Sequence, residues 1–213
     1  MGRAKRGRTP PPRTPAPTAI RLTKKDVVRR ELATAIRLFV GRGDPVAIHV
    51  LASAASAVLQ PIADAKGHLT GRSAFLDIYI KDEYRREAEL LVDEWFNYMK
   101  HGARDPDAEL NTFSPEINKM QLLLLSRDYM MVFRETFVEA TVFMATLGSL
   151  EPRFLTDQEQ PAFLKMVEAV KLLAKAEALT WEGAGTALRA ADDAAAEAAA
   201  RGIDISSLGR RPA

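Results

Sequence analysis

The sequence predicts an all-α protein, a bundle of five to six helices preceded by a disordered basic N-terminal tail. Apolar residues recur with helical spacing along most of the chain, and Pro and Gly stand where such helices would begin and end. Strand-like alternation is confined to AFLDIYI at 74–80, between helical patterns. At 213 residues and 47% hydrophobic content, the chain suits one domain with a substantial core. We divide it into a tail over 1–22, a bundle domain over 23–182, and an Ala-rich C-terminal helix with its tail over 183–213.

The charge is distributed unevenly along the chain. Residues 1–25 hold eight Lys or Arg and no acid, and Arg210 and Arg211 add two more bases. Residues 26–209 therefore hold 20 bases against 28 acids, so we expect an acidic body between basic ends. Five of the 12 Pro lie within residues 10–17, a composition typical of a disordered segment. Such a tail can contact nucleic acid weakly and without sequence specificity.

The first helix is predicted over residues 24–40. Thr23 can cap its start and Asp26 falls in its first turn, where an acidic side chain is favoured. Its apolar stripe is formed by Val28, Leu32, Ile36 and Phe39.

The sequence GRGDP then separates the first helix from the second. Gly41 and Gly43 act as breakers, Asp44 as the N-cap and Pro45 as the first helical residue. The second helix should run to about residue 66, with Pro61 kinking or ending it.

Three or four further helices follow. A loop over 67–73 leads to a third helix that includes AFLDIYI and extends to residue 101. The sequence FSPEI opens a fourth helix, with Ser114 as its cap, which is predicted to reach Leu147 and to stop at Gly148. A fifth helix is predicted over about 158–181, and EGAG separates it from a last, Ala-rich helix over 186–201 that buries few large side chains. The region around FVEATVFMATL is apolar on most of its circumference, which predicts the central helix of the bundle or one shared with a second subunit.

The stretch WFNYMKHGARDPDAEL supplies the first candidate site. Asn97, Lys100, His101 and Arg104 share one helical face if the helix continues through them. The same residues also suit a simple helix end, because Lys100 and His101 would face the negative end of the helix dipole and Gly102 would close the helix. We favour the helix end.

The string Asn97-x-x-Lys100-His101 on a long helix resembles the HEPN superfamily. That resemblance implies a helical bundle, often dimeric, and in many members a metal-independent ribonuclease with an Arg-x4-6-His motif. Counting back from His101, the positions for the Arg hold Phe96, Trp95 and Glu94, so the residue that stabilises the phosphoryl transition state is missing. AIRLFVGRGDPVAIHVLASAA and NYMKHGARDPD together resemble an uncharacterised family of small helical bacterial proteins, which implies a helical fold and no known activity.

His49 is the second candidate. It forms a polar row with Ser53, Ser56 and Gln60 along the second predicted helix. One interpretation is a core histidine with its hydrogen bonds satisfied in a helix packed through small residues. The alternative is the wall of a small-molecule pocket that faces His101.

The remaining observations restrict the class of function. The chain has no Cys, and none of the three His lies at the Glu-x-x-His spacing of a helical di-iron site. It carries no Walker loop, zinc spacing, HExxH or GxSxG motif, so we expect no metal and no cofactor. No apolar run is long enough for a membrane helix, and we expect a cytoplasmic protein.

We therefore predict a non-enzymatic helical interaction or regulatory module, with another protein or a second copy as its partner. A HEPN-like metal-independent ribonuclease and a small-molecule-binding helical protein are the alternatives.

Overall fold

The computed structural model describes residues 20–71, 83, 94–100, 107–151 and 160–203. These residues are helical wherever they form regular structure, which confirms the all-α fold. The named helices are α1 (Lys24–Val40), α2 (Pro45–Ala65), α5 (Ile117–Phe133), α6 (Val138–Leu150), α7 (Gln160–Ala174) and α8 (Trp181–Ala200), and residues 94–100 are helical as well. Residues 1–19 of the predicted basic tail and most of the third predicted helix lie outside the described residues.

The junction between α1 and α2 is formed as predicted. Thr23 and Asp26 make a reciprocal capping box at the start of α1. The side chain of Asp44 caps α2 by accepting a hydrogen bond from the backbone N–H of Ala47 at 2.8 Å, and Pro45 is the first helical residue. Pro61 does not end α2, because the helix continues to Ala65.

The left-handed residue that closes α1 is Arg42 (φ 55°), not one of the glycines beside it. Its N–H donates to the carbonyl of Phe39, and the N–H of Gly43 donates to that of Leu38, the two bonds of a Schellman motif. The backbone of Gly43 lies close to Leu38, because a Cβ at this position would be 3.0 Å from Cδ2 of Leu38. Glycine therefore suits this position.

The predicted fourth helix is wrong in its extent, because the chain from 117 to 150 forms two helices. α5 ends at Phe133 and is followed by Arg134, which adopts the left-handed conformation (φ 56°). α6 begins after Phe137. A tertiary contact holds this break: the Glu135 carboxylate accepts a hydrogen bond from the hydroxyl of buried Tyr129 at 2.6 Å and pairs with Lys25 of α1 at 3.1 Å. The start is also later than predicted, since Ser114 and Pro115 lie in a turn that precedes α5. Gly148 does not end α6; it is buried inside the helix.

The sequence EGAG does not separate the last two helices. Thr180 caps α8 by accepting from the N–H of Gly183 at 3.0 Å, so both glycines of EGAG lie in its first turns. Gly185 lies where α8 packs on α1, and a Cβ there would lie 3.6 Å from a methyl group of Val40. The chain stays helical through this glycine. Only Ala184, Ala187 and Leu188 of α8 are buried, so the Ala-rich half packs weakly, as predicted. In α7 the buried side is formed by Phe163, Val167, Val170 and Ala174.

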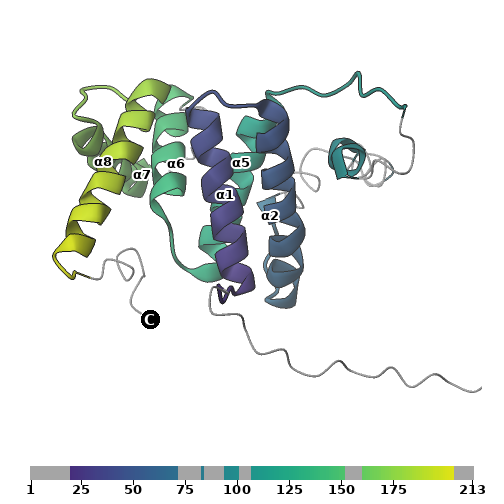
Figure 1. The fold of residues 1–213 in the computed structure, drawn as a ribbon, viewed down its shortest axis with the longest axis horizontal. Helices are drawn as coiled ribbons and strands as arrows, with labels where there is room; N and C mark the ends of the chain where they lie inside the picture. The colour runs from purple at the N-terminus through teal and green to yellow at the C-terminus, as the bar shows by residue number, and fades with distance from the viewer. Residues whose placement is uncertain (1–19, 72–82, 84–93, 101–106, 152–159, 204–213) are drawn as a thin grey trace, which may run out of the picture.

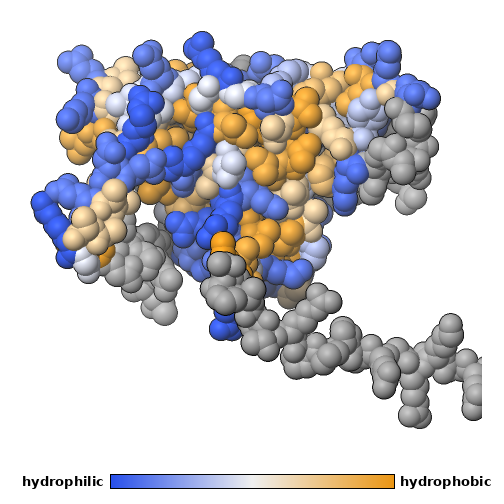
Figure 2. Space-filling model, in the orientation of Figure 1, coloured by the Kyte–Doolittle hydropathy of each residue, from blue (hydrophilic) through white to orange (hydrophobic). Residues whose placement is uncertain are grey.

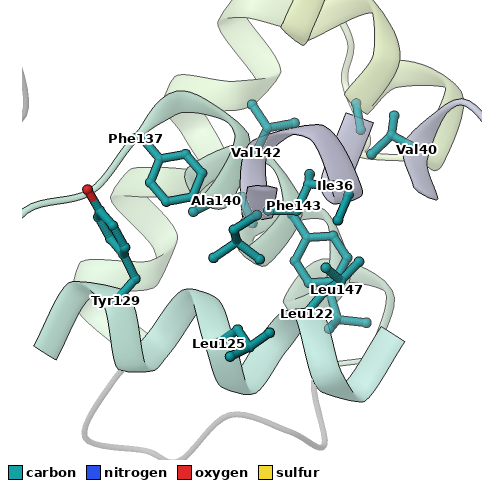
Figure 3. Packing of buried hydrophobic residues seen from close by; sticks show 14 of the residues in the cluster. Ile36, Val40, Leu122, Leu125, Tyr129, Phe137, Ala140, Val142, Phe143 and Leu147 are labelled. Carbon is teal, nitrogen blue, oxygen red and sulfur yellow. The ribbon is translucent and has the colours of Figure 1, made fainter. Parts of the chain in front are cut away.

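The bundle is organised around α1 and α6. α1 contacts α2, α5, α6 and α8, and α6 contacts α1, α5, α7 and α8. Figure 1 shows α6, α1 and α2 next to one another with α5 behind α1 and α2, the α7–α8 pair at one end, and the C-terminal end of α8 projecting from the body. Figure 3 shows the core between them, where Ile36 and Phe143 pack toward Leu122 and Leu147. The prediction that α6 is a central helix is confirmed, since it is buried on most of its surface.

Candidate functional site

The structure places His49 in the interior, between α2 and α5. Its side chain is 2% exposed, and Nδ1 lies 3.2 Å from Oδ1 of Asn118, a residue of α5 that is 1% exposed. The amide nitrogen of Asn118 donates to the carbonyl of Pro45 at 2.9 Å, which leaves its oxygen as the acceptor for His49. We therefore assign the proton of the neutral imidazole to Nδ1.

Nε2 of His49 is then an acceptor, and Ser53 is its partner. The Ser53 hydroxyl lies 3.5 Å from Nε2, one turn further along α2, and it accepts a hydrogen bond from the amide nitrogen of Gln121 at 3.0 Å. The donors point in one direction, from Gln121 through Ser53 and His49 to Asn118 and the carbonyl of Pro45. We call these four side chains the His49 network. It joins the start of α2 to the start of α5.

Two aromatic rings enclose the imidazole. The centroid of Trp95, from the helical stretch 94–100, lies 5.9 Å from that of His49, and Phe113 lies at 5.3 Å, both edge-on. The indole N–H of Trp95 donates to Thr112 at 3.0 Å. Burial lowers the pKa of His49, and the hydrogen bond to Asn118 opposes this only in part. His49 is thus held as a neutral ring.

Of the predicted helix-end site, the structure describes Asn97 and Lys100, and neither joins this network. Asn97 and Lys100 are exposed, and the Lys100 ammonium lies 5.3 Å from the ring of Phe96 on its own helix. His101 and Arg104 lie outside the described residues, and so does the predicted helix end at Gly102. The described contact between this stretch and His49 is made by Trp95.

Asp128 is a second buried polar group on α5. It is 4% exposed and accepts a hydrogen bond from the backbone N–H of Gly71 at 2.7 Å. Burial raises the pKa of Asp128 to about 6, although the hydrogen bond from Gly71 and the charge of Arg127 act against the rise. A Cβ on Gly71 would lie 3.2 Å from the same carboxylate oxygen. Glycine therefore suits a backbone that lies this close to Asp128.

The order of groups in the His49 network is that of a nucleophile, a base and an orienting amide. Its burial argues against catalysis: Ser53 is 8% exposed and already hydrogen-bonded to Gln121, and Trp95 and Phe113 cover the imidazole. Among the residues that the structure describes, no group of three His, Asp or Glu could hold a metal ion. The geometry supports a core histidine with satisfied hydrogen bonds, the first interpretation of the sequence.

Sequence reasoning missed Asn118 and Asp128. A signal was present for Asn118, because it shares a helical face with Leu122, Leu125 and Tyr129, which are buried. A polar residue on such a face indicates a buried hydrogen-bonding role.

No protein-family model, curated protein or solved structure matches the chain. The candidate surfaces must therefore be judged on their own chemistry.

Proposed function

We propose that the protein is a non-enzymatic helical module that pairs with a second copy of itself through the outer face of α2. The observation that carries this proposal is a long uncharged stretch of α2 with one solvent-exposed face. From Pro45 to Ala63 the sequence contains no Asp, Glu, Lys or Arg. The expectation that no apolar run is long enough for a membrane helix is wrong for α2, which among the described residues is the one helix with the length and composition of a membrane span. In the bundle, 39% of its most apolar window is buried.

The free face is continuous along the helix. We name it the α2 outer stripe, and it follows helical spacing through Val46, Val50, Ala54, Ala57 and Pro61. Val46 is 42% exposed, Ala57 and Pro61 are exposed, and the other two are half-buried. Figure 2 shows apolar surface over α2 on the side opposite α5.

The lack of charge and the small side chains of the α2 outer stripe favour a second copy of the chain as its occupant. In a two-fold interface each surface meets itself, so every charge would face a like charge close to the axis, and an uncharged stripe avoids this repulsion. In addition, Ala54 and Ala57 are small and let two helices approach closely.

The test is the mass of the full-length protein in solution, measured by sedimentation velocity across a wide range of concentration. We expect a species of twice the 23.5 kDa chain mass. Ala57→Glu should weaken pairing by roughly tenfold or more, because it buries an unpaired charge at the interface. Thr34→Glu, an equal charge change at an exposed position of α1, is the matched control and should leave the dimer intact.

Three results would contradict the proposal. The first is a wild-type protein that stays monomeric at every concentration. The second is Ala57→Glu pairing as tightly as the wild type. The third is a monomer that co-floats with lipid vesicles through the α2 outer stripe, which would assign this face to a membrane surface.

A further inference from the structure

A groove of about 540 Å³ lies between the C-terminal end of α1 and the first turns of α8. None of its lining residues belongs to the His49 network or to the α2 outer stripe. Its volume is within the range of small-molecule sites. The groove is formed by segments that are far apart in the sequence, so the tertiary structure creates it.

The groove has an apolar floor and a basic rim. Val40 and Leu188 are 8% and 4% exposed, which places them at the bottom, and Trp181 is half-buried beside them. Contacts with Phe39 and Phe143, at centroid distances of 5.1 and 5.6 Å, hold the indole of Trp181 in place.

Two guanidinium groups on the rim are available to a ligand. Arg37 is already occupied, since it binds both oxygens of Asp192 and also Glu139. Arg42 and Arg189 are exposed, and within the described part of the chain neither forms an ion pair; Arg189 only donates to the Thr186 hydroxyl at 3.1 Å. Glu182 is the acidic residue on the lining, so the basic residues outnumber it.

The backbone of Arg42 adds a second argument. This residue adopts the left-handed conformation between two glycines, although a glycine in its place would remove the steric cost. Arg134 and Lys175 occupy left-handed positions after α5 and α7, so the conformation is not unique to the groove. Of these three residues, Arg42 is the one that lines it.

We propose that this groove binds a small organic anion. Arg42 and Arg189 hold its phosphate or carboxylate group, and its apolar body rests on Val40, Leu188 and Trp181. Gly185 lines the groove without a side chain, and a Cβ there would lie at an ordinary contact distance of 3.6 Å from both Val40 and Arg189. This inference is independent of the pairing proposed for α2.

The probes are naphthyl phosphate, naphthoate and the neutral naphthyl methanol, titrated into the full-length protein by calorimetry. We expect saturable binding of at least one anion and none of the alcohol. The anion that binds more tightly identifies phosphate or carboxylate as the preferred group. The absence of saturable binding by either anion would overturn the proposal, and so would equal binding of the alcohol.

Arg42→Gly is the most informative variant. It should raise the melting temperature, because glycine accepts the left-handed conformation, and lower the anion affinity by roughly tenfold. Arg134→Gly is the matched control: it relieves a left-handed residue that does not line the groove, so affinity should be unchanged. Gly185→Leu should fill the groove and abolish binding. Unchanged affinity in Arg42→Gly, or an equal loss in Arg134→Gly, would exclude the site.

Discussion

Ionisation of the buried Asp128 carboxyl opposes folding. Its pKa is raised to about 6 from 3.8, so the neutral carboxyl is favoured in the folded state. Its stabilising contribution is therefore present below about pH 4 and is lost as the pH rises through about 6. We predict that Asp128→Asn, which keeps an acceptor for Gly71, raises the free energy of unfolding at pH 7 by on the order of 2 kcal/mol and changes it little at about pH 4.

Urea unfolding at the two pH values measures this difference. Asp64→Asn, at an exposed position on α2, serves as the control and should show no comparable gain. A less stable Asp128→Asn protein at pH 7 would mean that the hydrogen bond from Gly71 requires the full negative charge.

His49 has the opposite pH dependence. Its pKa is lowered in the folded state, so its contribution is present above about pH 6.5 and is lost as the pH falls toward the folded pKa. Asn118→Ala should cost on the order of 1 to 3 kcal/mol, because it leaves the buried N–H of the His49 ring without an acceptor. The pKa of His49 is measured by following the NMR chemical shifts of its imidazole as a function of pH. An Asp128→Asn background removes the titration of Asp128 from this measurement. A His49 that titrates at or above about pH 6.5 would contradict the buried neutral ring.

At the scale of the element, the start of α2 depends on one side chain. Asp44→Ala should lower the free energy of unfolding by about 1 kcal/mol, since the N–H of Ala47 loses its acceptor. Asp44→Asn keeps the acceptor and should retain most of the stability. Thermal or urea unfolding of the two variants measures the difference. An Asp44→Ala protein as stable as the wild type would show that the Asp44 cap does not stabilise α2.

At the scale of the whole molecule, the basic tail and the acidic body should behave independently. Deletion of residues 1–19 should leave the melting temperature nearly unchanged, because the segment is poor in large apolar residues. The same deletion should remove salt-sensitive binding to nucleic acid, which calorimetry at low and high salt can follow. A fall of many degrees in melting temperature would show that the tail contributes to the core.

The sequence by itself determined the helical class and the junction between the first two helices. Thr23 and Asp44 cap helices through atoms three residues away, and Pro45 fixes its own backbone angle, so these signals are complete within one turn. The apolar spacing of α1 likewise identified Val28, Leu32 and Ile36 as part of its buried face, whereas Phe39 is half-buried.

The tertiary structure alone decided where the long apolar region breaks and what surrounds His49. The turn between α5 and α6 contains neither Gly nor Pro; it depends on Glu135, whose partner Lys25 is 110 residues away. EGAG contains two helix breakers, yet it stays helical where α8 packs on Val40. His49 and Asn118 are 69 residues apart, and only the packing of α2 on α5 brings them together. Local signals act through the backbone of one turn, whereas these pairings need a folded bundle to exist.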